Sequence, residues 1–106
     1  MSGFDKREED FEKKFAHDED LRFRAHARRN KLAGLWAAEK LGLAGAAADT
    51  YASDLVASFV NASSADLFKK LRKDFDDKGV VQSDHQINRM LEEFMAKAVV
   101  EINAGR

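Results

Sequence analysis

Residues 17 to 20, with the sequence His-Asp-Glu-Asp, have side chains of the types that bind metal ions and exchange protons. Successive residues of a helix point in different directions, and a hard cation needs about six converging oxygen ligands. Because this stretch cannot supply them alone, we expect no metal site. His26 and His85 have no partner at ligand spacing, so we expect them to be surface or turn residues.

Motifs for catalysis are absent from the sequence. It contains no P-loop, no G-x-G-x-x-G, no EF-hand loop and no nucleophile with a neighbouring base. We therefore expect that the chain is not an enzyme.

The densest cluster of residues with the same charge is basic and consists of Arg22, Arg24, Arg28, Arg29 and Lys31. Trp36 follows it closely in the sequence. On one interpretation these cations form the solvated outer face of a helix. On the other they bind carboxylates or phosphates of a partner, because guanidinium groups bind both through paired hydrogen bonds. The hypothesis of a docking site, or of a weak contact with an adenine nucleotide, applies to Arg22, Arg28, Arg29, Lys31 and Trp36. No other cofactor is expected.

Phenylalanine is concentrated near the N-terminus, where Phe4, Phe11, Phe15 and Phe23 make up half of the eight in the chain. The first three are seven and four residues apart, a spacing that places them on one side of a helix. Every residue from 5 to 14 except Phe11 is charged, so an isolated helix would have few apolar neighbours. This segment could fold back on the rest of the chain. We favour the alternative, an arm that becomes helical in a groove of another protein.

The composition is that of one small domain. The chain has 106 residues, of which 44% are apolar, enough for a single modest core. With 18 basic and 19 acidic residues, neither nucleic acid nor an anionic membrane is an expected partner. Cysteine is absent, which excludes disulfides and thiolate metal sites. There is neither an apolar run of about 20 residues nor the apolar stretch of a secretory signal, so we expect a cytoplasmic protein. We also expect the free protein to be monomeric.

The absence of proline and the abundance of good helix formers predict an all-α fold. A first helix is predicted to run from the arm to about Leu41 and to end at Gly42, which suits a cap with positive φ. Its expected inner face consists of Leu21, Ala25, Leu32, Leu35 and Trp36. Gly34 within it indicates either close approach of another helix or of the Trp36 ring, or tolerance at an exposed site. A second helix is predicted at about 46 to 61, with its apolar residues facing the core.

Capping signals define the remaining two helices. The third is predicted to begin at Ser63 or Ser64 and to run to Lys78. The fourth is predicted to start at Ser83, where Gln86 completes a capping box. Their predicted apolar faces are Leu67, Phe68, Leu71 and Phe75 in the third, and Ile87, Met90, Leu91, Phe94, Met95, Ala98, Val99 and Ile102 in the fourth. Short connections favour a small bundle, with Val80 and Val81 tucked against it.

Three stretches of the first 42 residues carry a resemblance to a known family. They are FDKRE at 4–8, KFAHD at 14–18 and ARRNKLAGLWAAEKLG at 27–42, of which the last is highly specific. The segment from Phe4 to Glu39 resembles the zeta subunit of the F-type ATP synthase of alphaproteobacteria, a family of small helical ATPase inhibitors. Beyond about residue 40 the resemblance is one of helical pattern and spacing.

The resemblance implies a four-helix bundle at residues 19–106 with a mobile inhibitory arm at residues 1–18. Family members insert this arm as a helix at a catalytic interface between the alpha and beta subunits, against the gamma stalk, and so block ATP hydrolysis. The arm residues predicted to bind the partner are Phe4, Asp5, Arg7, Glu8, Phe11, Lys14, Phe15, His17 and Asp18. The implied location is the catalytic head of the membrane-bound ATP synthase. A nucleotide-responsive regulatory module and a helical protein–protein adaptor are the alternatives.

Overall fold

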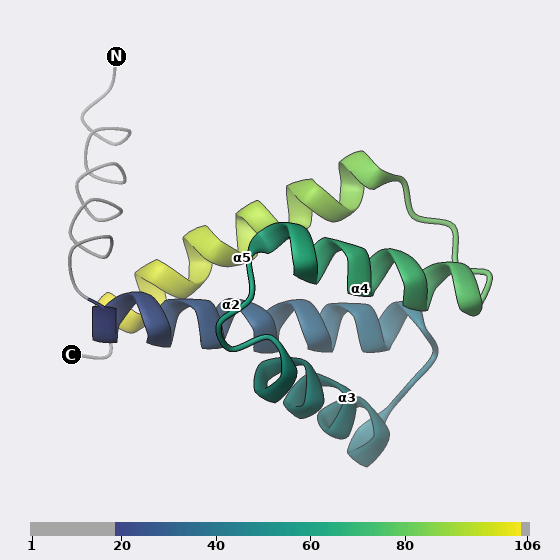
Figure 1. Cartoon of the computed structure of the whole chain (residues 1–106). Helices are drawn as coiled ribbons and strands as arrows, with labels where there is room; N and C mark the ends of the chain where they lie inside the picture. The colour runs from purple at the N-terminus through teal and green to yellow at the C-terminus, as the bar shows by residue number, and fades with distance from the viewer. Residues whose placement is uncertain (1–18, 105–106) are drawn as a thin grey trace.

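The computed structural model describes residues 19–104, and within this range the chain forms four α-helices and no strand (Figure 1). The helices are α2 (Glu19–Lys40), α3 (Gly45–Ser58), α4 (Ser64–Asp77) and α5 (Asp84–Ala104). The predicted all-α bundle is therefore confirmed. The predicted arm lies outside the described residues, so the division of the chain at residue 18 stays a prediction.

Glycines end two of the helices where the sequence predicts it. Gly42 has a φ of +81°, and its N–H donates to the carbonyl of Glu39 at 3.1 Å while Leu43 N–H donates to Ala38 at 2.9 Å. Gly79, with a φ of +69°, follows α4 in the same way. A left-handed residue turns the chain back over the last carbonyls of a helix, and glycine adopts that conformation at no steric cost.

Serines begin α4 and α5. The Ser63 hydroxyl accepts a hydrogen bond from Asp66 N–H at 3.2 Å, so Ser63, and not Ser64, caps α4. At α5 the Ser83 hydroxyl accepts from Gln86 N–H, and the Gln86 side-chain oxygen accepts from Ser83 N–H, both at 3.0 Å. The predicted capping box is therefore present.

Helix α2 is the central element of the bundle. It packs against α3, α4 and α5, and α4 also packs against α5 (Figure 1). The start of α2 lies beside the end of α5, where Leu21, Ala25 and Val99 form a small apolar cluster. The main core lies toward the other end and consists of Ala33, Ala37, Leu55, Leu67, Leu71, Phe75, Ile87 and Leu91.

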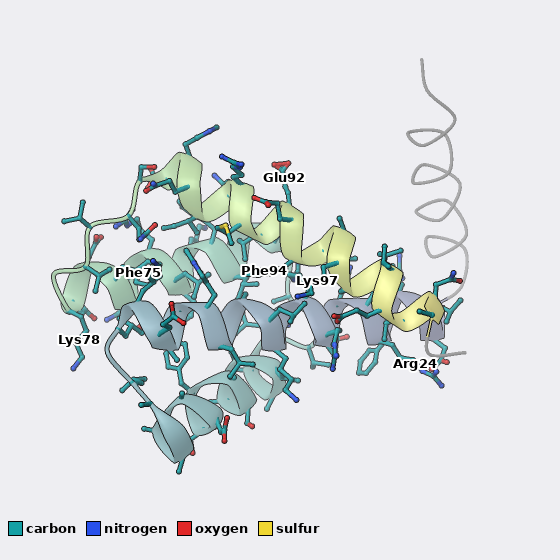
Figure 2. The ribbon with its side chains drawn as sticks, turned by 180° about the vertical axis from the view of Figure 1, so that it is seen from behind. Arg24, Phe75, Lys78, Glu92, Phe94 and Lys97 are labelled. Atoms are coloured by element: carbon teal, nitrogen blue, oxygen red, sulfur yellow. The ribbon has the colours of Figure 1, made fainter. Side chains whose placement is uncertain are left out.

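Two partly buried aromatic rings, those of Trp36 and Phe94, pack against the main core. The ring centroid of Trp36 lies 5.5 Å from that of Phe75 at an interplanar angle of 88°, and 6.1 Å from that of Phe94. Phe75 and Phe94 come from α4 and α5 (Figure 2), so these contacts connect three helices. Edge-to-face packing of this kind contributes about 0.5–1.5 kcal/mol beyond the area that it buries.

The predicted inner face of α2 is correct in part. Leu21 and Ala25 are buried, but Leu35 is 37% exposed and Leu32 is only partly buried. The buried positions that the prediction missed are Arg29, Asn30, Ala33, Gly34, Ala37 and Ala38. Small side chains occupy most of this face around Gly34, where α3 approaches closely, and Leu35 is turned outward.

The connection from α4 to α5 also differs from the prediction. Val80 packs against the core, but Val81 is 93% exposed. The hydrogen bond from Val80 N–H to the Phe75 carbonyl, at 2.8 Å, holds Val80 against the end of α4. The side chain of the following residue, Val81, consequently points to solvent.

Gly34 marks the closest approach between α2 and α3. A Cβ atom at this position would lie 2.7 Å from the Cα of Ala52 and 3.0 Å from its Cβ. The nearest of these atoms belongs to backbone and cannot move away alone. Of the two interpretations of Gly34, close approach of another helix is therefore the correct one.

We predict that Gly34→Ala lowers the free energy of unfolding by about 1–3 kcal/mol, the usual cost of an added methyl group in a closely packed contact. The loss is expected although alanine has the higher helix propensity. Urea denaturation followed by circular dichroism measures it, with Glu39→Ala, at an exposed position of the same helix, as the control that changes little. A Gly34→Ala protein as stable as the wild type would contradict the assigned helix contact.

Candidate functional site

The residues predicted to bind a partner fall into two groups, and the structure describes only the second. The group from Phe4 to Asp18 lies outside the described residues, so its role stays a prediction. The second group, the basic cluster and Trp36, lies on α2.

Three of the predicted docking residues, Arg22, Arg28 and Lys31, are exposed on α2. Arg28 reaches across to α5, where its Nε donates to Glu101 Oε1 at 2.8 Å. This hydrogen bond holds the pKa of the Glu101 carboxyl below its usual value. These three side chains are accessible to a partner.

Arg29 contradicts the interpretation of the cluster as one solvated face. Only 2% of it is exposed. Its Nε donates to Asn30 Oδ1 at 2.8 Å, and its Nη1 donates to the Ser64 hydroxyl at 2.9 Å. Arg29 therefore faces inward and connects α2 to the start of α4, where it is not available to a docking partner.

Asn30 extends this polar connection. It is fully buried, and its Nδ2 donates to the Phe59 carbonyl, at the end of α3, at 3.1 Å. Burial lowers the pKa of Arg29, but a guanidinium starts from so high a value that it remains charged. The buried polar groups of Arg29 and Asn30 are thus satisfied by Ser64 of α4 and by the carbonyl of Phe59, as a stable interior requires.

Trp36 is not beside the exposed cations of α2. Its ring packs on Phe75 and Phe94 in the main core. The structure thus separates the predicted docking residues into an exposed set (Arg22, Arg28 and Lys31) and an inward-facing set (Arg29 and Trp36). Weak nucleotide binding by the whole cluster stays a prediction that this arrangement does not favour.

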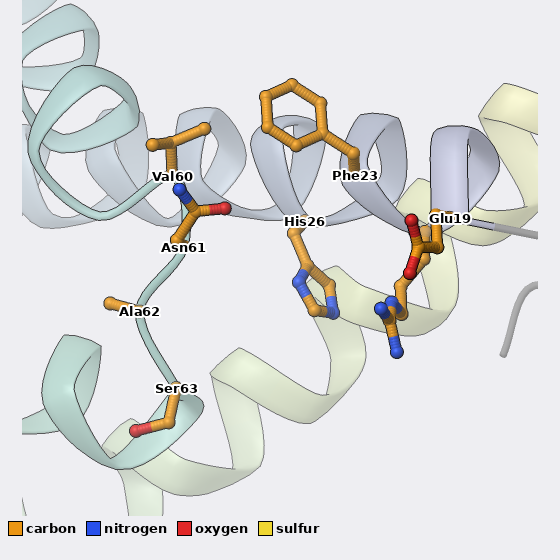
Figure 3. A pocket seen from close by; sticks show the side chains of 8 residues that line it. Glu19, Phe23, His26, Val60, Asn61, Ala62 and Ser63 are labelled. Carbon is orange, nitrogen blue, oxygen red and sulfur yellow. The ribbon is translucent and has the colours of Figure 1, made fainter.

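A hollow of about 500 Å³ lies between the start of α2 and the connection from α3 to α4 (Figure 3). It is lined by Glu19, Arg22, Phe23, His26, Val60, Asn61, Ala62 and Ser63. Partial burial lowers the pKa of His26, and the positive charges of Arg29 and Arg22 lower it further. The imidazole is therefore held toward its neutral form. No group of three or more His, Cys, Asp or Glu side chains in residues 19–104 is arranged to bind a metal ion.

Phe23 is a feature of this hollow that the sequence analysis did not place in a site. Its side chain is 47% exposed, the most of any aromatic residue in the described part of the chain. A signal was present, since Phe23 follows Phe15 by eight residues and so continues the spacing of the phenylalanines in the arm. The hollow itself could not be found from the sequence, because its two sides are more than 30 residues apart.

We predict that Arg29→Ala lowers the free energy of unfolding by about 2–4 kcal/mol, because Asn30 and Ser64 each lose a buried partner along with the packed arginine stem. Arg28→Ala, at the preceding residue, is the matched control. Its exposed ion pair contributes about 0–1 kcal/mol. Chemical denaturation of both variants provides the comparison, and equal losses would contradict the structural role given to Arg29.

The lowered pKa of His26 predicts a pH dependence of stability. The unfolded chain binds the proton at the ordinary value of 6.5, whereas the folded chain binds it only at lower pH. The contribution of neutral His26 is therefore fully present above about pH 6.5 and is lost as the pH falls below it. Between pH 7 and pH 5 the free energy of unfolding should fall less steeply in His26→Gln than in the wild type. Identical slopes for His26→Gln and the wild type would contradict the prediction.

No helix of the described residues has the length and apolarity to cross a membrane.

Comparisons with known proteins identify the family of the chain. A search of curated proteins found no significant match. The family model for ATPase inhibitor subunit zeta matches residues 1–101, nearly the whole chain. The chain therefore belongs to the ATPase inhibitor subunit zeta family, a regulatory family, as the resemblance in its first 40 residues predicts.

Proposed function

We propose that this chain inhibits ATP hydrolysis by the F-type ATP synthase by inserting residues 1–18 as a helix at a catalytic interface between the alpha and beta subunits, against the gamma stalk. The observation that carries the proposal is the family match, which begins at residue 1, includes the arm and ends at residue 101, within α5. An inhibitor subunit of an ATPase implies the ATP synthase as its partner, and its place of action would be the catalytic head of that enzyme.

The proposed mechanism needs no chemistry of its own. A rotary enzyme cycles each catalytic interface between open and closed shapes, so a helix lodged in one interface must be expelled before rotation continues. As a helix, 18 residues would span about 27 Å at 1.5 Å per residue, enough to reach inward from the surface of an interface.

The affinity of the arm would come from Phe4, Phe11 and Phe15. Aromatic side chains in closed pockets supply most of the binding free energy in many interfaces, while charged neighbours at the rim contribute little. The cost of ordering the arm offsets part of this gain. The helical bundle would hold the arm at its attached end, since α2 begins at Glu19, directly after the arm in sequence.

Replacing Phe11 and Phe15 together by alanine in the full-length chain tests the proposal. We expect inhibition of ATP hydrolysis by the purified ATP synthase to weaken by about 2 kcal/mol or more, roughly 30-fold in the inhibitory concentration. The melting temperature should change little.

The matched control is the pair Glu9→Ala and Lys13→Ala, in the same arm but outside the predicted contact residues. It should inhibit like the wild type. Unchanged inhibition by the phenylalanine variant would contradict the proposed contacts, and a large loss of thermal stability would assign the two rings to the core.

A further inference from the structure

A second, apolar hollow of about 350 Å³ lies on the outer side of α2, between α3 and α5. Its floor consists of Phe23 and Ala27 from α2, Val56 from α3 and Ile102 from α5. Phe23 is 47% exposed and is the largest of the four. We call the floor, together with the cations at its edge, the Phe23 surface.

The edge of the Phe23 surface is basic and consists of Arg24, Arg28 and Lys31. The spacing of four and three residues places them in one row along α2. Arg24 forms an ion pair with Asp20 at 3.2 Å and Arg28 forms one with Glu101 at 2.8 Å.

Lys31 has no carboxylate at ion-pair distance among residues 19–104. Among residues 19–104 the three cations of this row therefore form two ion pairs, which leaves the row with excess positive charge.

Phe23 also lines the hollow that contains Arg22 and His26 (Figure 3), so it belongs to both hollows. A half-exposed aromatic ring bordered by arginine side chains has the composition of the residues that dominate protein interfaces. The aliphatic stems of Arg24, Arg28 and Lys31 extend the apolar area, while their charged ends select the partner by its charge.

The position of this surface connects it to the arm. Phe23 lies about one helical turn after Glu19, the first described residue. Arg24 lies at the end of the molecule where the chain enters α2 (Figure 2). A protein that binds the segment before Glu19 would therefore come within reach of the Phe23 surface.

We propose that the Phe23 surface is a second binding site, occupied by an acidic amphipathic segment of the ATP synthase catalytic sector. An aliphatic or aromatic side chain of that segment fills the apolar hollow, and a carboxylate beside it pairs with Lys31. Only the identity of the partner rests on the proposed function; the chemistry follows from the hollow and its charges. A second copy of this chain fits less well, because a two-fold contact would bring the same row of cations together.

The test measures binding of full-length variants to the isolated catalytic sector. Phe23→Ala should raise Kd about 10-fold or more, with a melting temperature close to that of the wild type. Lys31→Glu should also raise Kd, and should make Kd less dependent on salt concentration. The matched controls are Leu35→Ala, at a 37% exposed apolar position of α2, and Lys69→Glu, at an exposed position of α4. Both controls should bind like the wild type.

The outcomes distinguish this inference from the proposed function. If the wild type inhibits hydrolysis and both Phe23→Ala and Lys31→Glu bind with wild-type affinity, the second site is refuted while the action of the arm stands. If binding requires Phe23 and Lys31 but the wild type does not inhibit, the second site stands and the proposed function fails.

Two further results would refute the assigned occupant. Conversion of a wild-type dimer to a monomer by Phe23→Ala, in analytical ultracentrifugation, would identify a second copy of the chain on this surface. Tighter binding of Phe23→Ala to the catalytic sector would indicate that residues 1–18 of the same chain cover it.

Discussion

The contact between Gly34 of α2 and Ala52 of α3 sets the geometry of the bundle, because it fixes how closely α3 can lie against the central helix. The buried residues that follow and precede Gly34 include Ala33, Ala37 and Ala38, which leave little apolar volume on the inner face of α2. The large core side chains consequently come mostly from the other helices, with Leu55, Leu71, Phe75 and Ile87 among them. A leucine beside Gly34 cannot enter so narrow a space, which accounts for the exposure of Leu35.

The buried Arg29 and Asn30 divide the interior of the bundle along α2. On one side of them lies the small cluster around Leu21 and Ala25, and on the other the main core that begins at Ala33. Their hydrogen bonds reach the end of α3 and the start of α4, so the connection between these helices is fixed in register against α2. A buried polar pair of this kind tolerates few alternative arrangements, because each would leave a donor or acceptor without a partner.

The boundaries of the helices could be predicted from the sequence because they depend on local signals. Gly42 and the Ser83–Gln86 pair act within a few residues of the turn that they form, and the structure has them where they were predicted. The family could also be predicted, since its specific residues lie in one continuous stretch.

The inner face of α2 could not be predicted from the sequence. Whether Leu35 or Gly34 is buried depends on the distance to Ala52. In the same way, Arg29 is buried because Ser64, 35 residues further along the chain, supplies its partner.

The charged residues of the candidate site could be predicted from the sequence, but its apolar hollow could not. The exposed cations Arg28 and Lys31 were identified by charge alone, but the hollow beside them requires Val56 and Ile102 from two other helices. A high density of charge along a sequence indicates residues that can contact a partner. It does not find the apolar floor that would hold that partner, because the floor exists only after α3 and α5 have packed against α2.

The two proposed contacts are neighbours in the sequence, because residues 1–18 directly precede α2, and this has an energetic consequence. Leu21 and Ala25 are packed on the end of α5, so the first turns of α2, with Phe23 on their outer side, have a fixed orientation. A partner held at the Phe23 surface would therefore present its neighbouring surface to residues 1–18 at high effective concentration, and binding of the arm would become an intramolecular step. Neither contact would need to be tight alone. Rotation of the enzyme could then expel the arm from its interface while the bundle stays attached, and the arm could return without a new encounter between the two proteins.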